Sequence, residues 1–306
     1  MVQESKPGRL RLADGLSVSR MGYGAMQLPG PGVWGPPADR AGALAVLRRA
    51  AELGVDHLDT SDAYGPHVAN DLIREALHPY PAGLVIATKV GAVRDEQGAF
   101  VPAASPGALR DQVEENLTRL RADALDLVYL RAGGDGLLAP DPTPLAESFA
   151  ALARLRDEGL VRALGLSGVT DGQLAAAREI APVAAVQNRY HLLDRGAAEV
   201  LRYCAEHGIA FVPYFPLAAG LLRPGLDPSG LPPGFGLSAG QAETLDKITS
   251  RNGASRAQVA LAWLLASAPV TLLIPGTTSL AHLAENLAAA SIQLPPEDLA
   301  ELDQLA

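Results

Sequence analysis

The strongest constraint on the fold is a regular alternation of short apolar runs with longer segments of helical periodicity. Runs rich in Val, Ile and Leu predict strands at residues 21–27, 57–59, 84–89, 125–131, 163–167, 184–187, 210–214 and 271–275. Helices are predicted at residues 40–53, 68–77, 106–120, 144–158, 171–180, 197–206, 255–267 and 281–289. Four helices begin with an N-cap residue followed by proline or by a glutamine that completes a capping box: Ser105–Pro106, Thr143–Pro144, Thr170 with Gln173, and Ser255 with Gln258. The pattern therefore indicates an α/β fold around a buried parallel sheet.

Eight strand–helix repeats can close into a (β/α)₈ TIM barrel or spread into a doubly wound sheet. The barrel is favoured because no G-x-G-x-x-G turn follows the first strand and no segment resembles a domain linker. We therefore predict one barrel domain over residues 1–306. Residues 9–19, with Asp14–Gly15 between two apolar runs, predict an N-terminal β-hairpin that plugs the barrel floor. The Gly- and Pro-rich stretch 218–239 predicts a functional loop.

Charge and composition exclude several kinds of partner. The formal net charge is −9 with both signs interspersed, so the basic face that nucleic acid or an anionic membrane requires is not expected. The one cysteine, Cys204, provides no disulfide framework. No apolar run approaches the roughly 18 residues that span a bilayer, and the first residues lack a signal-peptide core. A cytoplasmic protein without a metal site is expected, and the sequence indicates no particular oligomeric state.

Polar residues stand at the carboxyl ends of several predicted strands, where the active sites of barrels lie. Asp59 ends the second strand and Tyr64 follows it, while Lys89 and Arg131 end the third and fourth. Each residue alone has an ordinary structural interpretation; Arg131, for example, can pair with Asp135. Together, an acid, a phenol and two cations converge on one pocket mouth, which is difficult to obtain by chance.

This combination of side chains has a specific chemistry. A phenol is a weak acid near neutral pH, and a lysine ammonium within hydrogen-bonding distance favours its ionised form. A carboxylate beside the lysine fixes its position and charge. Asp59, Lys89 and Tyr64 therefore form a tuned proton donor for an oxygen that gains negative charge, and a hydride source fits as its partner.

The segments DTSDAYG, IATKVG, GLSG, VPYFPLAAGLL and IPGTTSLAHLAEN resemble those of the aldo-keto reductases over essentially the whole chain. The resemblance implies reduction of a small aldehyde or ketone by NADPH, with NADH as a weaker possibility. It implies that Asp59, Tyr64 and Lys89 belong to a catalytic tetrad, with Tyr64 as general acid, and that Trp34 and His67 line the substrate pocket. The implied cofactor contacts are Gly24, Met26, Ser167, Gln187, Tyr214, Phe215, Leu217, Gly220, Gly276, Thr277, Ser279, His282, Glu285 and Asn286.

The sequence departs from this family pattern at three places. Arg131 replaces the tetrad histidine, and Gly168 replaces an asparagine that contacts the nicotinamide carboxamide. Gly276 and His282 stand where many members have a lysine and an arginine for the 2′-phosphate. The arginine is shared with a bacterial subgroup in which some members reduce pyridoxal, which suggests pyridoxal or another aromatic aldehyde as substrate.

Two other functions remain open from the sequence. Lys89 can act as a Schiff-base nucleophile, as barrel lysines do in aldolases, although this leaves Asp59 and Tyr214 without a role. Because the tetrad histidine is absent, the chain can also be an NADPH-binding redox-sensing module with slow turnover.

Overall fold

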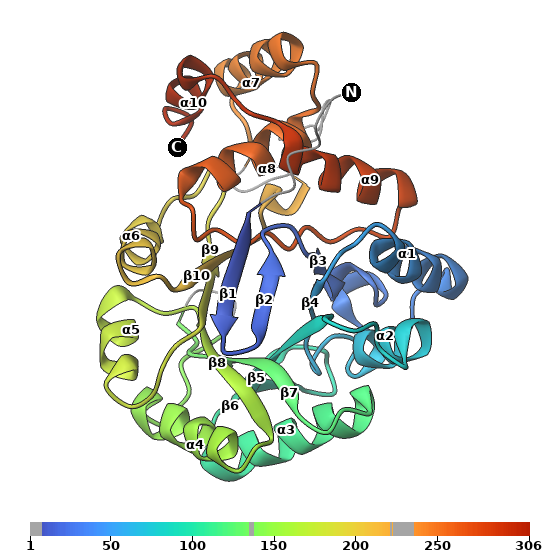
Figure 1. The fold of residues 1–306 in the computed structure, drawn as a ribbon, viewed down its shortest axis with the longest axis vertical. Coiled ribbons are helices and arrows are strands. Elements are labelled where there is room, and N and C mark those ends of the chain that lie inside the picture. Colours follow the sequence, from blue (N-terminus) through green and yellow to red (C-terminus); the bar gives the residue numbers. More distant parts are fainter. Residues whose placement is uncertain (1–7, 135–137, 221, 223–235) are drawn as a thin grey trace.

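The computed structural model describes residues 8–134, 138–220, 222 and 236–306. Its centre is a curled parallel sheet with helices around its outer face (Figure 1). The parallel strands, in their order across the sheet, are β3 (Tyr23–Gly24), β4 (His57–Asp59), β5 (Val85–Arg94), β7 (Leu125–Arg131), β8 (Val161–Ser167), β9 (Ala185–Arg189) and β10 (Ala210–Tyr214).

The sheet closes through residues 271–273, which lie between β10 and the chain before β3. Met21 pairs with Leu273 and Phe211 pairs with Thr271, both in parallel. The Gly22 amide donates to the Leu273 carbonyl at 2.7 Å, and the Leu272 amide donates to the Phe211 carbonyl at 2.8 Å. We call this junction the barrel seam. Its bridges confirm the predicted (β/α)₈ barrel, although the predicted strand 271–275 pairs only as isolated bridges.

The hairpin of β1 (Arg9–Ala13) and β2 (Leu16–Ser19) lies across one end of the barrel, as predicted (Figure 1). Leu12, Leu16 and Val18 are buried in one apolar cluster with residues that project into the barrel from its strands. The hairpin therefore closes the floor with apolar side chains.

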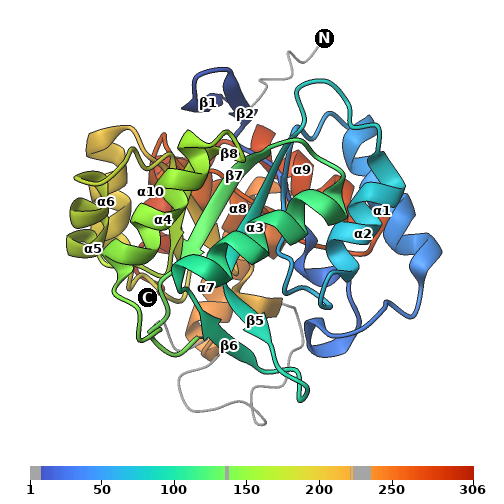
Figure 2. The same cartoon turned by 90° about the horizontal axis from the view of Figure 1, so that it is seen from below.

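A second hairpin projects from the opposite end of the barrel (Figure 2). The strand predicted at 84–89 continues as β5 to Arg94 and pairs in antiparallel register with β6 (Phe100–Ala103). The sequence did not predict this β5–β6 hairpin. The first strand is shorter than the predicted 21–27, because the chain turns into a 3₁₀ helix at Ala25–Gln27 directly after Gly24.

The predicted helices are all present, with ends shifted by at most a few residues. They are α1 (Arg40–Glu52), α2 (Val68–Leu77), α3 (Pro106–Leu120), α4 (Leu145–Asp157), α5 (Asp171–Arg178), α6 (Ala198–His207), α8 (Arg256–Ser267) and α9 (Leu280–Ala288). Two more helices, α7 (Ala239–Asn252) and α10 (Pro296–Leu302), were not predicted. None of the described helices has the length and apolar character needed to cross a bilayer.

The capping predictions hold at three helices and fail at one. The Ser105 hydroxyl accepts from the Ala108 amide, and the capping boxes at Thr170 and Ser255 are both formed. At α4 the N-cap is Pro144 rather than Thr143. The Thr143 amide instead donates to Oδ1 of Asp141 at 2.8 Å, so a turn that precedes the helix engages this residue.

The predicted loop 218–239 lies largely outside the described residues. Its first residues, Ala218–Gly220, form a short 3₁₀ turn, and its last residue begins α7.

Candidate active site

A cavity of about 720 Å³ opens at the carboxyl ends of the strands. Its wall contains residues at or near the ends of six strands, namely Asp59, Lys89, Arg131, Ser167, Gln187 and Tyr214. All the predicted catalytic and cofactor-contacting residues line this cavity. The parallel arrangement of the strands thus brings together side chains that are far apart in the sequence.

Lys89 and Asp59 form a buried ion pair at the bottom of the cavity. The Lys89 ammonium donates to Oδ1 of Asp59 and, at 3.0 Å, to the carbonyl oxygen of Thr60. Nε2 of Gln187 donates to the other Asp59 oxygen at 2.8 Å. The extra hydrogen bonds fix the position of both side chains. The Lys89 nitrogen is engaged by Asp59 and Thr60, which argues against a Schiff base on Lys89, because that bond needs a free amine.

Tyr64 lies in the loop between β4 and α2, and its ring packs beside this pair. The Lys89 nitrogen is 5.1 Å from the centre of the Tyr64 ring. The Tyr64 amide donates to the Ser61 carbonyl at 3.0 Å, and the Tyr64 carbonyl accepts from Ala69 at 3.1 Å. These bonds anchor the loop at both ends of the residue, so the phenol is held at the cavity wall next to the ammonium.

Two other tyrosines lie nearby but differ from Tyr64 in their surroundings. Tyr129 on β7 is fully buried and does not line the cavity. Burial, together with the charge of Asp59, holds the pKa of the Tyr129 phenol well above its usual value. Tyr214 does line the cavity, where its ring lies edge-to-face against Phe215 at 5.3 Å. Tyr64 is the cavity tyrosine whose ring the lysine ammonium approaches.

Arg131 also reaches the cavity. One guanidinium nitrogen, Nη2, donates to the Ser61 hydroxyl at 3.0 Å, and the guanidinium carbon lies 5.5 Å from the centre of the Phe100 ring. Ser61 belongs to the loop that carries Tyr64, so Arg131 is tied to the same loop as the phenol. Asp135, the alternative partner, lies outside the described residues.

The other end of the cavity follows the barrel seam. A Cβ atom on Gly24 would lie 2.5 Å from the Ile274 carbonyl oxygen, and one on Gly276 would lie 2.6 Å from the Gly24 carbonyl oxygen. Only glycine permits this close approach of the two chain segments. Ser279 caps α9, and its hydroxyl accepts from the His282 amide at 3.3 Å. The positive end of the α9 dipole and its amides suit a phosphate group.

Several cavity residues were not predicted from the sequence. Arg256 at the start of α8 lines the same cavity, and its guanidinium binds both carboxylate oxygens of Asp246 at 2.7 and 2.8 Å. The sequence did not indicate Arg256, because the family resemblance places the phosphate contacts in the segment from Gly276 to Asn286. The other unpredicted lining residues are Gln27, Phe100, Gly133, Leu138, Pro216, Leu222, Ser255, Ala257, Ile274, Pro275 and Thr278. Among the described residues, no cluster of side chains could hold a metal ion.

Trp34 and His67 are not among the residues that line the cavity, so their place in the substrate pocket stays a prediction. Trp34 is 39% exposed, and the Arg94 guanidinium carbon lies 5.5 Å from its ring centre. The reason is geometric, because the loop before Gly35 turns the indole toward the β5–β6 hairpin, where it packs against Gly98.

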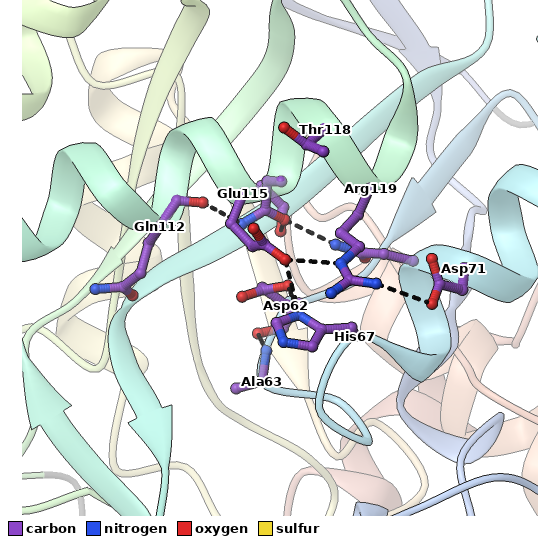
Figure 3. Close-up of polar contacts among 12 residues, drawn as sticks. Asp62, Ala63, His67, Asp71, Gln112, Glu115, Thr118 and Arg119 are labelled. Atoms are coloured by element: carbon purple, nitrogen blue, oxygen red, sulfur yellow. Dashed lines mark hydrogen bonds and ion pairs between the residues drawn. The ribbon is translucent and has the colours of Figure 1, made fainter.

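His67 lies at the N-cap position of α2 with a left-handed φ of 63°. Its Nδ1 is 2.6 Å from Oδ1 of Asp62 and 3.8 Å from Oε1 of Glu115 (Figure 3). The Arg119 guanidinium holds Glu115 from the next turn of α3, at 2.7 Å. The hydrogen bond to Asp62 raises the pKa of His67. The imidazole is therefore engaged on the outer side of the loop that carries Tyr64.

Known proteins match this chain over nearly its whole length. The aldo/keto reductase family model matches residues 20–306. Pyridoxine 4-dehydrogenase of Escherichia coli (strain K12) is 47% identical over 291 residues, which cover 95% of this chain and 96% of that protein.

Solved structures have the same fold. Glycerol dehydrogenase from Gluconobacter oxydans superposes with a TM-score of 0.83 at 25% identity, covering 100% of this chain and 95% of that one. An aldo-keto reductase from Klebsiella pneumoniae in complex with NADPH gives a TM-score of 0.77 at 27% identity, with 98% and 95% of the two chains covered. Because sequence and fold agree across the barrel, the chain belongs to the aldo/keto reductase family.

Proposed function

We propose that this protein reduces an aldehyde to an alcohol with NADPH, and that Tyr64 donates the proton. The observation that supports this most is the Asp59–Lys89 pair, buried at the bottom of the cavity with the Lys89 nitrogen 5.1 Å from the Tyr64 ring centre. Family membership makes the chain an NAD(P)H-dependent oxidoreductase. The intact pair favours turnover over a slow redox-sensing role.

NADPH fits the cavity along the barrel seam. The α9 N-terminus with Ser279 and His282 would take the phosphate end, and the similar Klebsiella pneumoniae enzyme was solved with NADPH. Ser167 and Tyr214 would hold the nicotinamide end. The Gln187 amide nitrogen donates to Asp59, and the Gln187 carbonyl oxygen would accept from the carboxamide. A bound NADPH supplies the hydride.

The side chains of this protein account for the proton transfer. Tyr64 transfers its hydroxyl proton to the carbonyl oxygen of the substrate as that oxygen gains negative charge. Lys89, fixed by Asp59, stabilises the phenolate that remains. Arg131, tied to the same loop through Ser61, is placed to donate to the developing alkoxide.

The substrate we propose is pyridoxal or another aromatic aldehyde. This is supported by the 47% identical relative, which is named for pyridoxine dehydrogenation, the reverse of a pyridoxal reduction. The test is spectrophotometric: NADPH oxidation is followed with pyridoxal, benzaldehyde, methylglyoxal and a simple ketone. We expect turnover with the two aromatic aldehydes above that with the ketone. If NADPH binds but none of these carbonyls oxidises it, the proposed function is wrong.

A further inference from the structure

Four side chains form a column that runs from the protein surface to the active-site cavity, with aromatic rings and guanidinium groups in alternation. Trp34 is the outermost, and the Arg94 guanidinium carbon lies 5.5 Å from its ring centre. The same Arg94 carbon lies 4.1 Å from the centre of the Phe100 ring. The Arg131 guanidinium carbon, in turn, is 5.5 Å from the Phe100 ring. These distances are in the range of cation–π contacts. We call this set the Trp34–Arg131 column.

The β5–β6 hairpin builds the middle of the column. Arg94 and Phe100 are directly opposite each other in its register, so one cross-strand pair supplies both. Arg94 is held further by its Nη2, which donates to the carbonyl oxygens of Gly32 at 2.8 Å and Val33 at 3.1 Å. The hairpin is therefore fastened to the loop that carries Trp34. A barrel does not need this hairpin to close, which indicates a role for it at the cavity.

Only the inner half of the column faces the cavity. Phe100 and Arg131 are among the lining residues, while Arg94 and Trp34 lie behind them. Phe100 offers the cavity an apolar aromatic surface, and Arg131 offers a fixed cation with several donors. These two groups stand on the same wall as Tyr64, whose loop Arg131 contacts through Ser61.

The column also adds positive charge to this wall. Burial, followed by the nearby charge of Arg131, lowers the pKa of Arg94, while the charge of Asp95 raises it. The two guanidinium groups are therefore close enough to affect each other. By contrast, the Asp59 carboxylate in the cavity is already paired with Lys89.

We propose that the Trp34–Arg131 column is the substrate-recognition wall, and that it selects a flat aromatic aldehyde carrying an anionic substituent. The ring packs against Phe100, and the anionic group binds Arg131, with Arg94 strengthening the positive potential from behind. This inference rests on the proposed function, because it names the substrate class of the same reductase site.

The first test compares four aldehydes with the wild-type enzyme and NADPH: 2-carboxybenzaldehyde, its methyl ester, benzaldehyde and propanal. The carboxylate at position 2 is next to the carbonyl group, so Arg131 can contact both. The ester keeps the shape of the acid but not its charge. We expect kcat/KM for the carboxylate to exceed that for the ester by about tenfold, which is the size of one charge-assisted contact. Because the contact is electrostatic, the ratio is expected to fall when the salt concentration is raised about tenfold, from about 0.05 M to about 0.5 M.

The second test uses variants of the column. Phe100→Leu is expected to raise KM for the aromatic aldehydes by about three- to tenfold, the value of one aromatic contact, and to raise KM for propanal by a smaller factor. Phe100→Tyr keeps the ring and is expected to retain wild-type selectivity. Arg94→Met is expected to lower the ratio of kcat/KM for the carboxylate to kcat/KM for the ester. Val101→Ala, at the neighbouring position of β6 and outside the cavity, is the matched control and is expected to behave as the wild type.

The outcomes separate the two proposals. If the wild type turns over the aldehydes but treats acid and ester alike, or if Phe100→Leu affects propanal as strongly as benzaldehyde, the recognition wall is wrong while the reductase function stands. If the wild type binds NADPH, seen as a change in its fluorescence, but oxidises it with no aldehyde, the reductase function itself fails. A Phe100→Leu protein that no longer binds NADPH is misfolded, and the comparison of Phe100→Tyr with Arg94→Met then decides.

Discussion

Tyr64 is the residue on which the proposed chemistry depends. Tyr64→Phe removes only the hydroxyl, so we expect kcat to fall by about a hundredfold or more while the Kd for NADPH changes little. Kinetic assays and a fluorescence titration with NADPH measure the two quantities. Tyr203→Phe is the control, because the Tyr203 side chain does not line the cavity. Its hydroxyl accepts a hydrogen bond from Arg178 at 2.7 Å. A loss below about tenfold would assign the acid role to another group.

Arg131 replaces the histidine of the family pattern, and its contact with Ser61 fixes it beside the Tyr64 loop. Arginine stays cationic and presents several donors, so it can stabilise an alkoxide continuously over the pH range of the assay. We expect Arg131→Met to lower kcat/KM for the preferred aldehyde by about a hundredfold. Arg131→His is expected to retain more of the wild-type kcat/KM for neutral aldehydes than for anionic ones. Arg202→Met on the exposed side of α6 serves as control. If kcat/KM of Arg131→Met stays within about threefold of the wild type, Arg131 takes no part in catalysis, and only Asp59, Tyr64 and Lys89 do.

At the residue scale, strand ends were predictable and loops were not. Asp59 and Arg131 were found from the sequence because they end their strands, and a strand's period fixes where its last side chain points. Lys89 was found because it ends the predicted run 84–89, although β5 continues beyond it to Arg94. Trp34 and His67 lie in loops, whose conformation has no simple sequence code, so the sequence does not fix where their side chains point. Phe100 was missed for a different reason, because its strand, β6, was not recognised.

Among the elements, the β1–β2 hairpin contributes the floor of the barrel through three apolar side chains. Leu16 is 5% exposed within this cluster, so Leu16→Ala is expected to lower the free energy of unfolding by about 3 kcal/mol. Urea denaturation measures this, with Leu53→Ala at an exposed position as the matched control. KM for NADPH is expected to stay unchanged, because the hairpin lies at the end opposite the cavity. If Leu16→Ala lowers the free energy of unfolding by no more than Leu53→Ala does, the hairpin is not part of the core.

The start of α2 is stabilised in a pH-dependent way by the His67–Asp62 hydrogen bond. Because this bond raises the pKa of His67 in the folded state, its contribution is complete below the unfolded value of 6.5 and is lost as the pH rises through the folded value. We expect the stability difference between wild type and His67→Gln to shrink between pH 6 and a pH about two units higher. Urea midpoints at the two pH values test this, with His207→Gln on α6 as control. A difference that does not change with pH would contradict the assignment.

Element types followed from the sequence wherever periodicity and capping agreed. The capping box at Ser238 and Gln241 could have predicted α7, but the Gly- and Pro-rich stretch before it suggested only a loop. β6 contains Pro102, which argues against a strand; it is tolerated because β6 pairs only with β5 and lies at a sheet edge. The seam residues 271–273 were read correctly as extended, although their pairing is limited to isolated bridges.

At the scale of the whole molecule, His57 makes stability sensitive to acid. It is fully buried on β4, and within the described part of the chain neither ring nitrogen has a hydrogen-bond partner. Burial lowers its pKa from 6.5 to about 4, against the opposing charges of Asp59 and Asp56. As the pH falls from 6.5 toward 4, the unfolded chain binds a proton that the folded chain does not, so stability is lost.

The size of this shift corresponds to about 3 kcal/mol over that pH range. His57→Gln cannot titrate, so its stability relative to the wild type is expected to improve by that amount as the pH falls, whatever its stability at neutral pH. Urea unfolding of both proteins at neutral pH and at the acid end of the range provides the comparison. Parallel loss of stability in the two proteins would show that other groups cause the acid sensitivity.

The barrel seam has a consequence for the order in which the protein folds. Each inner strand pair joins neighbours in the chain order, whereas Met21 and Leu273 are about 250 residues apart, so their pairing closes the longest loop and carries the largest entropic cost. A nascent chain can assemble its interior strands while the first one waits, unpaired on one side, for a segment made much later. Because Gly24 and Gly276 come into contact only across this junction, refolding is expected to restore nucleotide affinity last, after helical content has already returned.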